Sequence, residues 1–191
     1  MTITPLTALF PRQPVPALAV PTVGGGTWRL ADQRPEHFTM IVFYRGLHCP
    51  ICATYLRDLD TRLDDFAKRG VGAVAVSTDD AARAAQAKEK WRIGSLPIGY
   101  GLDLDTARRW GLYVSSGRGT TSVGVAEPAL FAEPGLFVIR PDRTLYFGTV
   151  QTMPFARPHF ADILGALDFV IAKSYPARGE VTDPIDPALG A

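Results

Sequence analysis

The middle of the chain alternates between short apolar runs and longer stretches in which apolar residues recur every three or four positions. Residues 38–44 and 71–77 are almost uninterrupted apolar runs, which are typical of strands buried on both faces of a sheet. Between them, residues 50–70 repeat apolar side chains at helical spacing and predict one amphipathic helix that ends at Gly70. Its inward stripe comprises Cys52, Leu56, Leu59, Leu63 and Phe66.

The order of the predicted elements indicates an α/β fold with a central mixed sheet flanked by helices. Because strands and helices alternate, the two apolar runs should be neighbouring parallel strands, with the intervening helix packed on one face. Glycines 24–26 predict the turn of an N-terminal β-hairpin, and the Gly-rich stretch 115–124 predicts a mobile loop in a middle insertion. The other predicted elements are strands at 17–20, 27–30, 96–100, 136–140 and 144–150, and helices at 79–92, 106–110 and 158–173.

The 191 residues suit a single domain of ordinary size. We assign residues 17–173 to this domain, residues 1–16 to an extended Pro-rich segment and residues 174–191 to a loose tail.

Composition narrows the class of protein. Hydrophobic residues make up 47% and charged residues 20%, and the formal net charge is +1. This near-neutral balance argues against a nucleic-acid partner or an anionic membrane surface. Prolines interrupt the apolar residues near the N-terminus and no basic residue precedes them, so neither a signal peptide nor a membrane span is predicted. The expected location is therefore the cytoplasm.

The two cysteines, Cys49 and Cys52, are the main candidates for chemistry. A disulfide across three positions closes too short a loop to add much stability, so the pair indicates reactivity. Cys49 precedes the predicted helix, where unpaired N–H groups favour a thiolate, and Pro50 suits the first helical position. One sulfur can attack a substrate while the other resolves the intermediate. We expect Cys49 to be the more exposed sulfur and the first to react, with Cys52 facing the core.

The residues that precede the pair, and two other roles for the cysteines, also have to be considered. Arg45 and His48 lower a thiol pKa if they point at a sulfur, and are otherwise a surface arginine and a satisfied core histidine. A structural zinc site needs four ligands, and the three histidines lack metal-ligand spacing, so no metal is predicted. No cofactor is predicted. Two buried, unreactive thiols are the structural alternative.

The run Val-Phe-Tyr-Arg-Gly-Leu-His-Cys-Pro-Ile-Cys at 42–52 resembles the peroxiredoxin-like branch of the AhpC/TSA group in the thioredoxin superfamily. Residues 24–32 resemble the hairpin that opens peroxiredoxin domains, and residues 135–142 resemble their late strand and turn. The similarity covers about residues 17–173 and implies a thioredoxin-like fold.

The resemblance implies two sets of roles. In a peroxiredoxin alignment, Cys52 stands at the peroxidatic cysteine, Cys49 at the active-site threonine and Arg45 at the signature proline. In a thioredoxin alignment, Cys49 attacks and Cys52 resolves. Pro134 stands where ordinary peroxiredoxins carry a peroxide-binding arginine and where thioredoxin-like reductases carry a cis-proline. The resemblance therefore implies a cis Pro134 in contact with the cysteines, and favours disulfide exchange.

The leading hypothesis is an antioxidant enzyme that uses its CxxC pair for thiol–disulfide exchange or peroxide reduction. Its partners would be a thiol reductant, either thioredoxin or a small thiol, and a disulfide or peroxide substrate; a homodimer is compatible with this role. The alternative is a non-catalytic thioredoxin-fold module for binding or redox sensing. Thiol reactivity at neutral pH separates the two hypotheses.

Overall fold

The two long apolar runs form the middle of a five-stranded sheet in the computed structural model, which describes residue 6 and residues 8–184. β3 (Phe38–Phe43) pairs in parallel with β4 (Val71–Val76), as predicted, and β4 pairs in parallel with β5 (Ile98–Gly99). β8 (Gly135–Ile139) pairs antiparallel with the other edge of β3 and with β9 (Leu145–Val150). The strand order β5-β4-β3-β8-β9 makes the sheet mixed and leaves β3 central.

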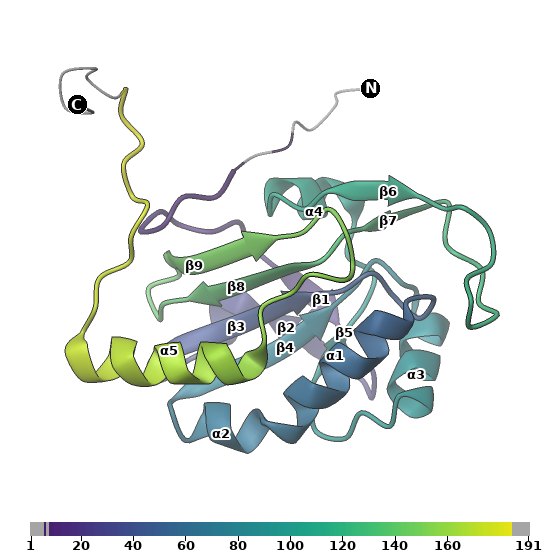
Figure 1. Ribbon diagram of the computed structural model, residues 1–191, viewed down its shortest axis with the longest axis horizontal. Helices are drawn as coiled ribbons and strands as arrows, with labels where there is room; N and C mark the ends of the chain where they lie inside the picture. The colour runs from purple at the N-terminus through teal and green to yellow at the C-terminus, as the bar shows by residue number, and fades with distance from the viewer. Residues whose placement is uncertain (1–5, 7, 185–191) are drawn as a thin grey trace.

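Helices cover both faces of this sheet (Figure 1). One face packs against α1 (Pro50–Thr61), α2 (Leu63–Ala67), α3 (Ala81–Lys90) and α5 (Phe160–Lys173). The other face packs against α4 (Leu104–Arg109) and the N-terminal hairpin. Because side chains alternate along a strand, Met40 and Val42 of β3 enter the first core while Ile41 and Phe43 enter the second.

The inward stripe of the predicted helix packs on the sheet as expected, but the helix is not continuous. Leu56, Leu59 and Phe66 are fully buried in the first core, and Leu63 is partly buried against it. The chain leaves helical geometry at Arg62, where α1 ends and α2 begins. The interruption follows Asp60, whose carboxylate accepts hydrogen bonds from two backbone N–H groups of the segment before β5. The break in the helix thus lies beside a hydrogen bond to a segment distant in sequence. The periodicity of the helix residues gives no sign of that contact.

The N-terminal hairpin is present, with β1 (Ala19–Pro21) paired to β2 (Thr27–Arg29) and followed by a short 3-10 helix, η1 (Leu30–Asp32). The middle insertion (residues 114–132) contains more regular secondary structure than predicted. β6 (Val114–Ser116) pairs antiparallel with β7 (Leu130–Ala132), so part of the predicted loop 115–124 is a strand. Small polar residues give no apolar alternation by which β6 could be recognised.

Arg12 joins the N-terminal segment to the end of the sheet and to the segment that follows α5. Arg12 N–H donates to the Leu145 carbonyl at 2.7 Å, and the Arg12 guanidinium pairs with Glu180 at 3.1 Å. Residues 1–5, 7 and 185–191, which belong to the predicted terminal segments, lie outside the described residues. Among the helices that the structure describes, none has the length and apolar character needed to cross a bilayer.

Candidate active site

The cysteine pair lies where β3 leaves the sheet and α1 begins. Cys49 is the residue that caps α1, Pro50 is the first helical residue, and Cys52 lies one turn into the helix. Cys52 N–H is shared between the Cys49 carbonyl at 3.1 Å and Cys49 Sγ at 3.4 Å, so the first turn of the helix directs a backbone donor at this sulfur. Both cysteines are free thiols.

The two thiols have pKa values shifted in opposite directions. A hydrogen bond from the Cys52 thiol, followed by the Cys52 N–H, Arg157 and Arg45, lowers the pKa of Cys49 to about 6 against the opposing effect of burial. Burial, together with donation to Cys49, raises the pKa of Cys52 well above its usual range. The arrangement therefore favours the thiolate form of Cys49 and the thiol form of Cys52.

Both sulfurs are shielded from solvent. Cys49 is 1% exposed and Cys52 is 0% exposed. The two exposures are nearly equal, so they do not distinguish Cys49 as the more exposed sulfur, and its role as the first to react stays a prediction. The capping position is solvated in an isolated helix, but here the segment between β9 and α5 brings Arg157 against both sulfurs.

Arg157 is the cation of the site, and sequence reasoning missed it. Its Nη2 lies 3.2 Å from Cys52 Sγ and 3.9 Å from Cys49 Sγ. Its guanidinium stacks over the Tyr55 ring at 5.1 Å, and its Nε donates to the Pro154 carbonyl at 2.8 Å. Its Nη1 is buried without a hydrogen-bond partner among the described residues. Of the three guanidinium nitrogens, Nη2 thus contacts the sulfurs, Nε donates to the backbone, and Nη1 has no partner among the described residues.

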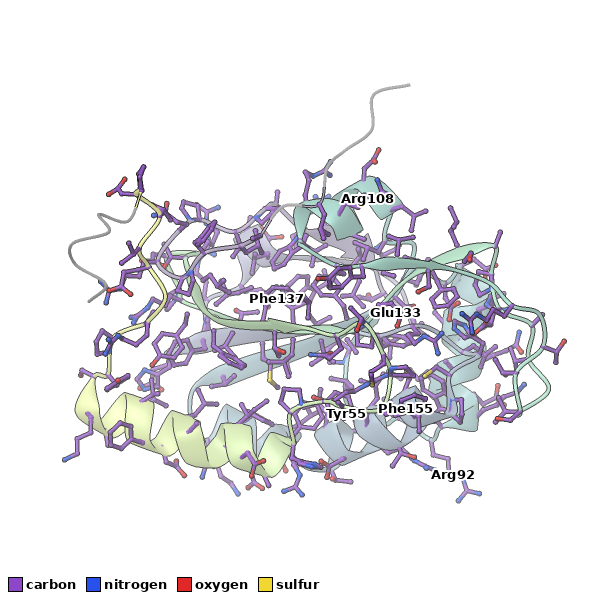
Figure 2. All side chains as sticks on the ribbon, turned by 45° about the horizontal axis from the view of Figure 1, so that its top comes forward. Tyr55, Arg92, Arg108, Glu133, Phe137 and Phe155 are labelled. Carbon is purple, nitrogen blue, oxygen red and sulfur yellow. The ribbon has the colours of Figure 1, made fainter. Side chains whose placement is uncertain are left out.

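The segment that carries Arg157 passes over the start of α1. Tyr55 of α1 donates its hydroxyl to the Pro158 carbonyl at 2.8 Å. Figure 2 labels Tyr55 and, on the crossing segment, Phe155, whose side chain is 73% exposed. Arg157 lies 105 positions after Cys52, so no sequence motif connects it with the cysteine pair. The one available signal is the proline at position 134, where ordinary peroxiredoxins carry a peroxide-binding arginine, because it leaves the role of that arginine to another residue.

Arg45 and His48 face the middle insertion. Arg45 forms ion pairs with Glu127 at 3.3 Å and Glu133 at 3.2 Å, and stacks on Phe131 at 4.7 Å. Two carboxylates thus offset its charge, and its effect on the pKa of Cys49 is the smallest of those named above. Glu133, labelled in Figure 2, directly follows β7.

His48 is fully buried and neutral. Its ring lies 4.6 Å from the Phe131 ring, and its Nε2 lies 4.0 Å from Glu127 Oε1. Burial, and then the nearby Arg45, lower the pKa of His48 to about 4. A neutral imidazole supplies no positive charge to a thiolate at pH 7.

Pro134 is buried immediately before β8, and its carbonyl accepts a hydrogen bond from Gln151 N–H at 2.9 Å. No peptide bond among the described residues is cis, so the prediction of a cis Pro134 is wrong. The contacts of the site thus group Cys49, Cys52 and Arg157, whereas Arg45 and His48 contact side chains from the insertion to the start of β8. Among the described side chains, no group of three or more His, Cys, Asp or Glu residues could hold a metal ion.

Comparison with known proteins identifies the family. Residues 11–147 match the AhpC/TSA family. A search of curated proteins gives no match. Among solved structures, peroxidoxin BcpB from Mycobacterium tuberculosis is 21% identical, with a TM-score of 0.66 over 85% of this chain and 99% of that chain. A peroxiredoxin 6 of Arenicola marina is 20% identical, with a TM-score of 0.69 over 96% and 86%.

A 2-Cys peroxiredoxin of Plasmodium vivax is 15% identical, with a TM-score of 0.70 over 87% of this chain and 84% of that chain. These likenesses confirm the expected thioredoxin-like fold, and the family match covers most of the sequence. The chain therefore belongs to the AhpC/TSA family, the peroxiredoxin-like redox enzymes of the thioredoxin superfamily.

Proposed function

We propose that this enzyme reduces hydroperoxides at Cys49 and closes an internal Cys49–Cys52 disulfide. The observation that carries the proposal is the position of Cys49 at the start of α1, beside an arginine that contacts both sulfurs and has an unpartnered Nη1. These neighbours, with the Cys52 thiol, lower the pKa of Cys49 to about 6. A thiolate is the nucleophilic form of cysteine, so Cys49 is reactive at neutral pH. Cys52, with its raised pKa, remains a thiol until the second step.

The chemistry balances in two steps. The Cys49 thiolate attacks the terminal peroxide oxygen, the O–O bond breaks, and the departing hydroxide or alkoxide takes a proton from solvent to become water or an alcohol. Cys49 is thereby oxidised to a sulfenic acid. Cys52 then loses its proton and attacks the Cys49 sulfur, and water leaves as the disulfide forms. A thiol reductant, either thioredoxin or a small thiol, returns both sulfurs to thiols.

Arg157 is the candidate substrate-binding residue. Its Nη2 holds the two sulfurs, and its Nη1 is left to donate to a peroxide oxygen. A fixed donor aimed at the oxygen on which charge develops stabilises the transition state. Arg157 would thus supply the positive charge that an arginine at the position of Pro134 supplies in ordinary peroxiredoxins.

The burial of the sulfurs favours a small substrate. Cys49 is 1% exposed and Cys52 is 0% exposed. A hydroperoxide therefore reaches the thiolate with less rearrangement of the protein than a folded protein disulfide needs. The peroxiredoxin names of the similar structures support the same choice. Disulfide exchange with a protein, and a sensor without turnover, are the two competing functions. The cytoplasmic location and the homodimer stay predictions.

The test is consumption of hydrogen peroxide and of a small organic hydroperoxide by the full chain with excess dithiothreitol. We expect catalytic turnover by the parent, and none by Cys49→Ser. Oxidation of one equivalent without turnover would instead indicate a sensor. Efficient reduction of a protein disulfide without peroxide consumption would indicate an exchange enzyme.

The cysteine roles are tested by trapping sulfenic acid with dimedone after one equivalent of peroxide. In Cys52→Ser we expect the label on Cys49, because no resolving thiol is left. Rapid labelling of Cys52 in Cys49→Ser would reverse the assignment and support the peroxiredoxin alignment.

A further inference from the structure

Asp79 is a buried carboxylate that lies beyond the end of β4, outside the cysteine pair and Arg157. Its side chain is 0% exposed. Such a group requires partners for its charge. Asp79 Oδ2 accepts a hydrogen bond from Leu47 N–H at 2.7 Å, and Asp79 Oδ1 accepts one from Arg83 Nε at 2.9 Å. One oxygen is therefore tied to the backbone just before Cys49, and the other to α3.

The backbone of Gly46 lies directly against the same carboxylate. Gly46 has a φ of +129°, and a Cβ atom added there would lie 2.6 Å from Asp79 Oδ1. Glycine alone adopts this conformation readily and also allows this close approach. The Gly46 carbonyl accepts a hydrogen bond from Cys49 N–H at 3.1 Å. The turn that Asp79 contacts is thus the turn that places Cys49.

The titratable side chains around Asp79 are those of Arg83, Asp80 and Tyr44. Arg83 also donates from Nη2 to the Ala126 carbonyl of the insertion at 3.1 Å, so its guanidinium is fixed at both ends. Burial raises the pKa of Asp79, while the hydrogen bonds from Leu47 and Arg83 act in the opposite direction and Asp80 adds a small unfavourable charge. Tyr44 is the other titratable neighbour, and its pKa is raised mainly by burial.

We propose that Asp79 is a positioning residue for the cysteine pair, holding the turn at 46–49 so that Cys49 Sγ receives the Cys52 N–H. This role rests on the proposed function, in which Cys49 reacts as a thiolate. The N–H to sulfur distance is 3.4 Å, and the influence of a helix terminus falls off within one turn. A small displacement of Cys49 therefore removes part of the stabilisation of its thiolate.

Charge and position predict opposite results when the carboxylate is neutralised. Loss of a negative charge near Cys49 favours its thiolate and lowers its pKa. Loss of the turn geometry weakens the Cys52 N–H contact and raises the same pKa. Asp79→Asn keeps the size of the side chain but sets an amide N–H₂ group against one of its two donors, so the direction of the shift separates the two effects.

The experiment measures the ionisation of Cys49 in the reduced full chain, from thiolate absorbance and from the alkylation rate as a function of pH. The parent should titrate at about pH 6. In Asp79→Asn we expect a rise of about one pKa unit, which lowers the alkylation rate at pH 6 about fivefold. The matched control is Asp80→Asn, an exposed neighbour that keeps its ability to cap α3, and its midpoint should stay within about 0.3 units of the parent.

Gly46→Ala disturbs the same contact from the other side without changing any charge. It should raise the midpoint in the same direction, and it decides the question if Asp79→Asn does not fold. An unchanged or lowered midpoint in a folded Asp79→Asn or Gly46→Ala protein overturns the positioning role alone. A parent midpoint near the ordinary thiol value overturns both this role and the proposed function.

Discussion

At the scale of the residue, the low pKa of Cys49 has to come from several neighbours acting together. A helix terminus contributes about 0.3–1 kcal/mol at an exposed site. One pKa unit corresponds to about 1.4 kcal/mol, so the terminus alone accounts for less than one unit. The decrease for Cys49 from 9.0 to about 6 is larger. The thiol and N–H of Cys52 and the Arg157 guanidinium supply the rest, at a site where burial opposes them.

The first prediction at this scale concerns Arg157. Arg157→Ala removes the donor left free for substrate, so kcat/KM for hydrogen peroxide should fall roughly 100-fold. Arg157→Lys keeps the charge without the planar guanidinium, so its kcat/KM should lie between those of the parent and Arg157→Ala. Arg57→Ala, an exposed arginine on α1, is the matched control and should match the parent. Stopped-flow peroxide kinetics provide the measurement. Equal rates in Arg157→Ala and the parent would remove Arg157 from the site.

At the scale of the element, α1 links the core to the chemistry. Its apolar stripe continues the face that carries Cys52, so packing of Leu56 and Leu59 on the sheet also fixes the first turn. Leu59→Ala should lower the free energy of unfolding by about 2–5 kcal/mol, because the side chain is fully buried. Thr54→Ala, on the exposed face of the same helix, should change it by less than about 0.5 kcal/mol. Urea unfolding of the reduced protein measures both, and comparable losses in the two variants would contradict this packing.

The sequence predicts those elements whose own residues carry the pattern. The apolar runs of β3 and β4 and the stripe of α1 are local signals, and the predicted strands and packing are confirmed. The interruption at Arg62 follows Asp60, which binds a distant backbone, and β6 is held by pairing with β7. Neither feature has a local signal. The cysteine pair could be found from its spacing, whereas Arg157 reaches it only through the tertiary fold.

At the scale of the whole molecule, the site is assembled from four segments that the sheet brings together. The turn before α1 supplies Cys49, the segment after β4 supplies Asp79, the insertion supplies Glu127, and the segment after β9 supplies Arg157. Asp79 contacts Leu47 of the turn, Glu127 lies 4.0 Å from His48 of the turn, and Arg157 contacts the sulfurs themselves. The charge of the Cys49 thiolate is thus stabilised by the complete fold, and unfolding the chain must return its pKa to the ordinary value.

This linkage predicts how stability depends on pH. The pKa of Cys49 is about 6 in the folded chain and 9.0 when unperturbed, so between these values the unfolded chain binds a proton that the folded chain does not. The free energy of unfolding of the reduced protein should therefore rise with pH from about 6 to 9, by at most about 1.4 kcal/mol per unit, and fall as acid protonates Cys49. Other groups also titrate, so the measurement is the difference between the parent and Cys49→Ser in urea unfolding at several pH values. That difference should grow with pH across this window and level off outside it, whereas parallel curves would show that the fold does not stabilise the thiolate.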